Sequence, residues 1–215
     1  MTRNSQQTRK NIISAVGKLL SRSGFRNLGI NAIAREAGVD KVLIYRYFGG
    51  IPDLLRAYAK EGDFWPTADE LLAGFGGKLP PDKSQLAAKL LIEFGRALRR
   101  RPITQEIMRW ELLERNELTD ALAHYREEQG MKLIRLVRGA RGLDLQALGS
   151  LLSAGQTYLV LRAKTAKVYN GLELSGDGDW KRIEKSIAHI VRLVFGHAKG
   201  PKRRKTNSSS KRRTG

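Results

Sequence analysis

Near the start of the chain, two short apolar patterns of helical period stand on either side of a single glycine. The first pattern, in the segment INAIAREAG, consists of Ile30, Ile33, Ala34 and Ala37. Its two alanines are small, which lets a neighbouring helix cross closely. Gly38 stands where a tight turn is needed. The pattern predicts a helix over residues 30–37 that is closed by Gly38.

The segment after the glycine, DKVLIYRYF, predicts a second short helix. Asp40 can cap its N-terminus, and Ile44 with Phe48 forms an inward pair at i, i+4 spacing. The opposite side carries Val42, Tyr45 and Arg46, with Leu43 beside them. An exposed aromatic and apolar face on so short a helix indicates a partner. The two segments together predict a helix, a short turn and a second helix.

DNA is the natural partner for this face, because a helix of this size fits the major groove. Lys41 and Arg46 can reach phosphates or guanine, while Val42 and Leu43 can meet thymine methyl groups. The alternative is that Tyr45 and Tyr47 only complete a small three-helix core.

Charge is concentrated at the two ends of the chain. The net charge is +19. Residues 1–60 carry 11 Lys/Arg against 3 Asp/Glu, and the last 18 residues carry 8 against 0. This distribution indicates that the two ends of the chain bind a polyanion. Residues 198–215 contain almost no apolar side chain and are expected to be a basic disordered tail that adds DNA affinity without specificity.

Beyond residue 60 every segment with a clear period is helical, so the chain is expected to be all-α. Helices are predicted over residues 8–23, 30–37, from 41, from 52, 83–101, 102–116, 119–139, 144–169 and 180–194, with a loop and one short helix near 69–73 between 61 and 81. Thr119 and Asp144 are the expected N-caps of their helices, and Asn170-Gly171 is the expected stop. The last helix carries a seam for a partner helix: Trp180, Ile183, Ile187, Ile190 and Val194.

No arrangement of residues supports an enzyme, and no catalytic residue, metal site or cofactor is expected. The chain has no cysteine, and its three histidines are scattered. The glycine-rich segment GFGGKLPP lacks the first glycine and the Ser or Thr of a phosphate-binding loop. The apolar run 148–161 is too short and too polar to span a bilayer, so no membrane partner is expected. Absence of cysteine fits a reducing interior, and a cytoplasmic location is expected.

Residues 8–60 resemble the N-terminal DNA-binding domain of the TetR (tetracycline-repressor) family of bacterial transcription regulators. The matching features are an amphipathic first helix ending in GF, then IAREAGV, then IYRYF, followed by a short turn and a Leu-Leu helix. The resemblance implies a homodimer that binds a double-stranded DNA operator, a helical ligand-binding domain, and repression relieved by a small molecule.

The resemblance also assigns roles to single positions. Base-contacting positions of the family correspond to Lys41, Val42, Leu43 and Tyr45. Phosphate-contacting positions correspond to Tyr47, Asn31 and the region of Thr8 and Arg9. The family commonly has a small residue and Thr where Val42 and Leu43 stand, so a different base preference is expected. It often has Lys where Ile51 stands, so one phosphate contact is expected to be missing.

The expected organisation is a three-helix helix-turn-helix DNA-binding domain at 1–60, a larger helical ligand-binding and dimerisation domain at 61–197, and the tail at 198–215. Dimerisation is expected through the helices at 144–169 and 180–194. A mostly apolar ligand is expected, near side chains that could equally be ordinary core packing: Phe94, Met108, Trp110, Tyr125 and Tyr158. The competing interpretation is a helical small-molecule or lipid-binding protein that its basic ends dock to anionic surfaces.

Overall fold

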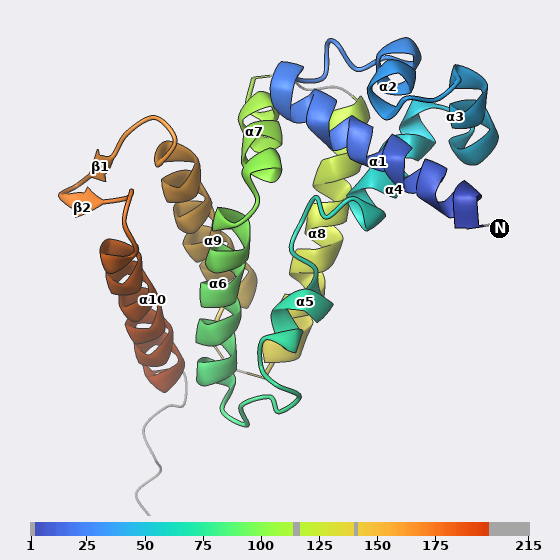
Figure 1. The fold of residues 1–215 in the computed structure, drawn as a ribbon. Coiled ribbons are helices and arrows are strands. Elements are labelled where there is room, and N and C mark those ends of the chain that lie inside the picture. Colours follow the sequence, from blue (N-terminus) through green and yellow to red (C-terminus); the bar gives the residue numbers. More distant parts are fainter. Residues whose placement is uncertain (1–2, 114–116, 140–141, 198–215) are drawn as a thin grey trace, which may run out of the picture.

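The computed structural model describes residues 3–113, 117–139 and 142–197. Within these residues the fold is helical apart from one short hairpin (Figure 1). The helices are α1 (Arg3–Ser23), α2 (Ile30–Ala37), α3 (Lys41–Phe48), α4 (Ile51–Glu61), α5 (Ala68–Ala73), α6 (Lys83–Arg99), α7 (Pro102–Glu111), α8 (Glu117–Val137), α9 (Leu145–Arg162) and α10 (Asp177–His197). The strands β1 (Val168–Tyr169) and β2 (Leu172–Glu173) form the hairpin. The predicted all-α class is confirmed, and the predicted tail lies outside the described residues.

The N-terminal helices follow the local signals in the sequence closely. Gly24, which ends α1, and Gly38, which ends α2, both have a φ of 66°, a backbone conformation that glycine adopts without strain. Asp40 caps α3, since its Oδ1 accepts a hydrogen bond of 2.8 Å from the backbone N–H of Val42. Ile44 and Phe48 are buried, as predicted. The helix, turn and helix predicted around Gly38 are therefore confirmed.

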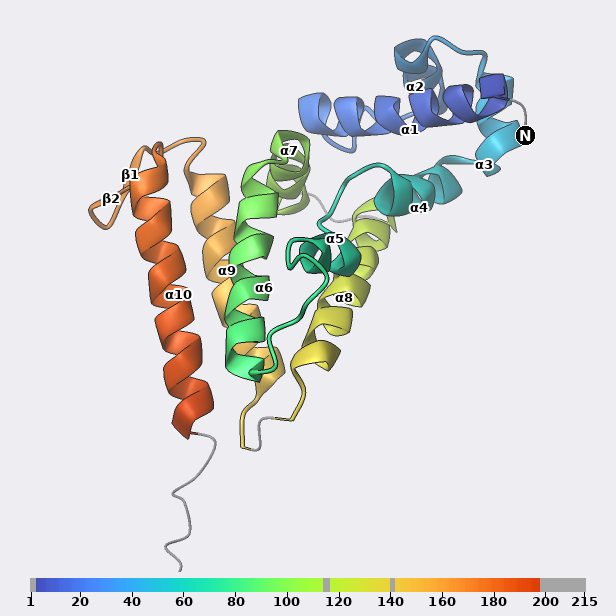
Figure 2. The ribbon, with the colours of Figure 1, turned by 60° about the horizontal axis from the view of Figure 1, so that its bottom comes forward.

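The C-terminal helices are arranged around α6. This helix packs against α10 and α9, and also contacts α5, α7 and α8. Figure 2 shows α6, α9 and α10 running side by side, with α1 lying across one end of the bundle. The core of the bundle contains Leu90, Phe94, Leu98 and Val160.

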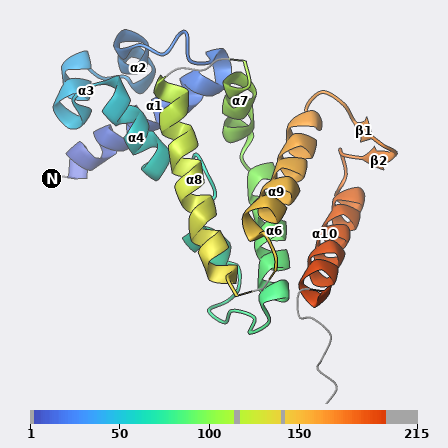
Figure 3. The ribbon, with the colours of Figure 1, turned by 180° about the vertical axis from the view of Figure 1, so that it is seen from behind.

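The N-terminal unit is joined to the bundle by direct packing. Helix α1 packs on α7, and α4 packs on α8. The hydrophobic core of the N-terminal helices continues into Ile107 of α7 and into Leu122 and Tyr125 of α8. Figure 3 shows α8 running from beside α4 to the opposite end of the bundle. A movement of α8 or α7 would therefore act directly on α4 or α1.

Several predicted helix boundaries were wrong. The first helix begins at Arg3 rather than at residue 8, and the helix expected over 102–116 ends at Glu111. The helix expected to reach residue 169 ends at Arg162, and Tyr169 lies in β1 instead. Asn170 and Gly171 have φ values of 48° and 77°, and this pair of positive φ angles makes a two-residue hairpin turn rather than a helix stop. Thr119 is buried inside α8, which begins at Glu117, so Thr119 is not its N-cap.

The apolar seam of the last helix faces its own chain for most of its length. Trp180 and Ile187 are each 5% exposed, and their clusters include α6 residues such as Ala88 and Leu98. Only Ile190, at 41%, points clearly outward. The seam was correctly recognised as a helix contact, but a second copy was wrongly expected to fill it. The periodicity marks a buried face and does not say which helix covers it.

Candidate nucleic-acid interface and ligand cavity

Helix α3 presents an apolar and aromatic face to solvent. Its side chains Val42 and Tyr45 are 62% and 53% exposed. Lys41 and Arg46 are also exposed, and Leu43 is half-buried. The helix is held from beneath by Ile44 and Phe48 and from its N-terminus by the Asp40 cap. Its outer face is therefore rigidly placed and accessible, which is the arrangement that base reading in a DNA groove requires.

The other residues predicted to contact DNA lie around α3, but they differ in exposure and in whether their side chains already have a hydrogen-bond partner. Tyr47 is half-buried, and its hydroxyl donates to Ser5 Oγ at 3.2 Å, which places the first turns of α1 beside α3. Asn31 is exposed at the start of α2. Thr8 is half-buried, and its hydroxyl donates to the backbone carbonyl of Asn4. The structure therefore brings residues from α1, α2 and α3 to one region of the N-terminal unit.

Arg9 differs from the other predicted phosphate contacts because its charge already has a partner. The guanidinium donates to Glu61 of α4 through both Nη1 and Nη2, and it lies 5.0 Å from the centre of the Phe48 ring. The hydrogen bond from Arg9 lowers the pKa of the Glu61 carboxyl. Arg9 thus ties α1 to the last turn of α4 and to the end of α3.

A cavity of about 580 Å³ opens among α6, α8 and α9. This volume is typical of a site for a small organic molecule. The apolar part of its wall includes Trp65, Leu90, Leu91, Phe94, Met131, Leu133, Ile134, Leu145 and Leu148. The polar part comprises Arg126, Glu127, Gln146, Ser150, Ser153 and Thr157.

The residues predicted to line a ligand site are not brought together there. Phe94 alone among the five lines the cavity. Tyr125 belongs to the core shared with the N-terminal helices, and Met108 packs half-buried against the bundle core. Trp110 and Tyr158 line a separate recess of about 500 Å³ between α7 and α9. The type of a residue does not indicate which face of its helix points inward, so the five residues chosen by type lie in different parts of the molecule.

A partly buried ion pair beside the cavity was not predicted from the sequence. Arg126 on α8 donates from Nη1 to Glu111 at the end of α7, at 2.9 Å from Oε1 and 2.7 Å from Oε2. Burial raises the pKa of Glu111 above its ordinary value, and the positive charge of Arg126 opposes this effect. Arg126 is one charge in the run YREEQ. Nothing in that run distinguishes it from residues on a solvated face.

A chain of aromatic rings leads from the cavity to the N-terminal unit. The ring centre of Phe94 lies 5.4 Å from that of Trp65, which lies 6.2 Å from Phe64. Phe64 in turn lies 5.8 Å from Tyr58 of α4, whose pKa is raised by burial. The guanidinium carbon of Arg126 lies 5.6 Å from the Trp65 ring centre and 5.8 Å from that of Phe64. These spacings are those of rings in contact.

The segment that carries two of these rings is fastened to the bundle. Arg101 donates to the carboxylates of Asp63 and Glu70, each at 2.6 Å. The hydroxyl of Thr104 donates to the backbone carbonyl of Phe64. The connection from α4 to α5 is therefore held by the start of α7.

The fold and the exposed α3 face define a helix-turn-helix DNA-binding domain attached to a helical bundle with a cavity. Residues 12–58 match the family described as bacterial regulatory proteins, tetR family. The N-terminal domain is thus that of the TetR family.

Comparison with individual proteins agrees with this assignment. The chain is 48% identical over 50 residues to the HTH-type transcriptional regulator HbdR of Aromatoleum sp. (strain CIB), a match that spans 23% of this chain and 22% of that protein. Among solved structures, the fold is similar to that of the fatty acid degradation regulator FadR from Bacillus halodurans, with a TM-score of 0.64, 19% identity, and coverage of 86% of this chain and 94% of that one. It is also similar to NalD, the secondary repressor of the MexAB-OprM multidrug efflux pump in Pseudomonas aeruginosa, with a TM-score of 0.63, 17% identity, and coverage of 86% and 96%. These two structures support the shared fold.

Proposed function

We propose that this protein is a dimeric transcription regulator, a repressor that leaves its operator when a small, mostly apolar molecule enters the cavity. The observation that carries the proposal is the exposed face of α3, with Val42 and Tyr45 presented on a helix whose other side is buried. A water-soluble domain has no reason to leave such a face uncovered unless a partner meets it. The proposed division is a DNA-binding domain at 1–60, a ligand-binding and dimerisation domain at 61–197, and a tail at 198–215.

The proposed DNA contacts are divided by role. Lys41, Val42, Leu43, Tyr45 and Arg46 would face the bases. Tyr47, Asn31 and Thr8 would contact phosphates. Arg9 would act by holding α1 and α4 together, because Glu61 already occupies its guanidinium. Base contacts set sequence preference, whereas phosphate contacts set affinity and register.

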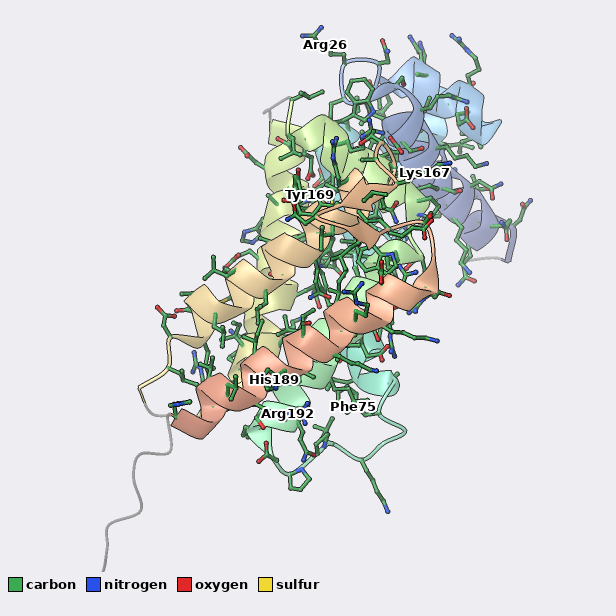
Figure 4. The ribbon with its side chains drawn as sticks, turned by 90° about the vertical axis from the view of Figure 1, so that its left-hand side faces the viewer. Arg26, Phe75, Lys167, Tyr169, His189 and Arg192 are labelled. Carbon is green, nitrogen blue, oxygen red and sulfur yellow. The ribbon has the colours of Figure 1, made fainter. Side chains whose placement is uncertain are left out.

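The outward faces of α9 and α10 support the proposed dimer. Leu151 and Tyr158 of α9 are 74% and 52% exposed, and Ile190 and Leu193 of α10 are 41% and 48% exposed. Figure 4 looks onto α10 and shows its side chains, with His189 and Arg192 labelled on the side toward the viewer. Two helices from each subunit would form a four-helix interface.

The ring chain from Phe94 to Tyr58 supports the proposed switch. A molecule that enters the cavity would touch Phe94 and Trp65, and displacement of Trp65 would press on Phe64 and Tyr58. Tyr58 lies on α4, which is joined to α3 by a short turn. The dimer would have one conformation in which the spacing of the two recognition helices fits the operator and another in which it does not. The ligand would release DNA only if it binds the second conformation more tightly than the first.

The test is to find the operator with the full chain on fragmented genomic DNA and to measure its affinity by gel shift against random DNA. A regulator should prefer the operator by at least about 1,000-fold. The competing function, a lipid-binding protein docked to anionic surfaces, should instead show flotation with anionic liposomes and equal affinity for all DNA fragments. That pair of results would refute the regulator.

A further inference from the structure

The cavity is long, and its charge is confined to one end. Its lining on α8 runs from Ala123 to Val137. At a rise of 1.5 Å per residue this distance is about 21 Å. Arg126 and Trp65 mark the end next to α4 and α5, whereas Val191 and Phe195 of α10 mark the other end. A compact cavity of the same volume would be far shorter, so the shape suits a linear molecule better than a compact ring system.

Between these ends the wall offers no charge to a ligand. The hydroxyls and the amide that line the cavity all lie on α9, and Ser153 already donates to the backbone carbonyl of Ser150. The charged lining residues are Arg126 and Glu127. Glu127 is exposed to solvent, whereas the Arg126 side chain is only 21% exposed. Arg126 is therefore the charge that a bound molecule would meet inside the cavity.

Arg126 has hydrogen-bonding capacity left for a second anion. Its bond to Glu111 uses Nη1. Arginine has five N–H donors, so Nε and Nη2 keep three that Glu111 does not use. The faces of Trp65 and Phe64 beside the guanidinium hold the group in place. A planar guanidinium fixed in this way suits the paired oxygens of a carboxylate or phosphate.

We propose that the cavity takes an elongated aliphatic molecule with an anionic head, and that the head competes with Glu111 for the guanidinium of Arg126. The inference rests on the proposed function in that it concerns the same ligand cavity. Among the described residues, Glu111 is the partner that neutralises Arg126, so an anion bound at Nε and Nη2 would share the charge of Arg126 and weaken its bond to Glu111 of α7. Arg126 also touches Phe64 and Trp65, which places this exchange directly on the ring chain to α4.

The experiment compares three molecules with the same tail on the full chain: decanoate, decanol and decyltrimethylammonium. Binding is measured by calorimetry and by tryptophan fluorescence, to which Trp65 in the cavity wall contributes, at probe concentrations below those at which micelles form. A charge-assisted hydrogen bond predicts that decanoate binds at least about tenfold more tightly than decanol. Hexanoate should bind more weakly than decanoate, because a shorter tail buries less apolar surface.

Two variants separate the exchange from general packing. Glu111→Gln removes the competing carboxylate, so it should raise the affinity for decanoate several-fold and leave that for decanol unchanged. Arg126→Met combined with Glu111→Gln removes both charges without leaving one buried alone. This double variant should bind decanoate and decanol equally. Thermal unfolding of each variant checks that it is folded.

The inference is overturned if the wild type binds decanoate no better than decanol, if it prefers the cationic probe, or if the double variant keeps the preference for decanoate. These results leave operator binding of the free protein, and hence the proposed regulator, untouched. Conversely, a chain that prefers decanoate and yet binds all DNA fragments equally supports the ligand class while the regulator fails.

Discussion

At the scale of single residues, the exposed side of α3 separates two kinds of DNA contact. Val42 and Tyr45 are exposed and free to meet base edges, whereas Tyr47 is held against Ser5 of α1. Substituting Val42 or Tyr45 by alanine should change which operator is preferred, by roughly 1–3 kcal/mol for each base pair misread. Tyr47→Phe should weaken operator and random DNA alike. The measurement is a set of gel-shift affinities on the operator, on single-base variants of it, and on random DNA. Equal losses on all fragments for all three variants would contradict the assignment.

Gly17 gives a second prediction at this scale. It lies inside α1, where glycine ordinarily costs stability relative to alanine. A Cβ at Gly17 would lie 2.9 Å from both Cε2 and Oη of Tyr58, which is fully buried in the core between α1 and α4. Gly17→Ala should therefore destabilise the protein by about 1–3 kcal/mol, measured by denaturant unfolding.

The matched control is Gly130→Ala, in the middle of α8. A Cβ there would meet no atom within 4 Å. This substitution should leave stability unchanged or raise it by up to about 1 kcal/mol. If both glycines responded alike, close packing of Tyr58 against α1 would not be the reason for glycine at position 17.

At the scale of helices, the pair Arg9–Glu61 fastens α1 to α4, and its contribution should depend on pH. The pKa of Glu61 is lowered in the folded chain, so the folded state releases the proton more readily than the unfolded chain. The stabilisation is therefore present above the unfolded pKa of a glutamate and is lost as the pH falls through the lowered value. Both side chains are partly exposed, at 26% and 46%, so the contribution should be at most about 1 kcal/mol.

The measurement is the free energy of unfolding of the wild type and of Glu61→Gln between pH 7 and pH 3. The variant should be less stable at pH 7, and the difference should shrink toward acid pH. Asp53→Asn is the control, because its ion pair is with Arg56, three residues along the same exposed helix, and joins no two helices. A difference that grows toward acid pH would refute the role of the pair.

At the scale of the whole molecule, the outward faces of α9 and α10 predict a dimer. Leu151 and Leu193 are 74% and 48% exposed, so both side chains are accessible to a second subunit. Replacing both by glutamate should give monomers at micromolar concentration, because charges would then stand inside an apolar interface. The monomeric variant should also bind the operator more weakly than the wild type, since two half-sites need two recognition helices. Sedimentation equilibrium and gel shift give the two measurements.

Leu79→Glu is the control for the dimer, since Leu79 is 46% exposed on the loop before α6. It should leave the association unchanged. Ile187 is unsuitable for this test, because it is buried against α6 and a charge there would unfold the subunit. A wild type that is monomeric at micromolar concentration would remove the proposed interface.

The structural features that the sequence predicted correctly depend on interactions between residues close together in the chain. Gly38, Asp40 and the Ile44–Phe48 pair act within one or two helical turns, so the sequence alone determined α2, α3 and the exposed face of α3. The end of α9 at Arg162 was missed because residues 163–169 contain no glycine or proline that would stop a helix, and the turn pair Asn170-Gly171 comes only after them.

Only the tertiary structure decided where the apolar and charged faces of the bundle point. The last helix has one apolar seam, and the placement of α6 determined that Trp180 and Ile187 are buried within the chain while Ile190 and Leu193 face outward. The same holds for the cavity, whose walls come from α6, α8 and α9, and for Arg126 and Glu111, which are 15 residues apart on different helices. Helical period specifies which residues share a face, because that is local geometry. Which faces meet depends on how the whole set of helices packs, and no single segment contains that information.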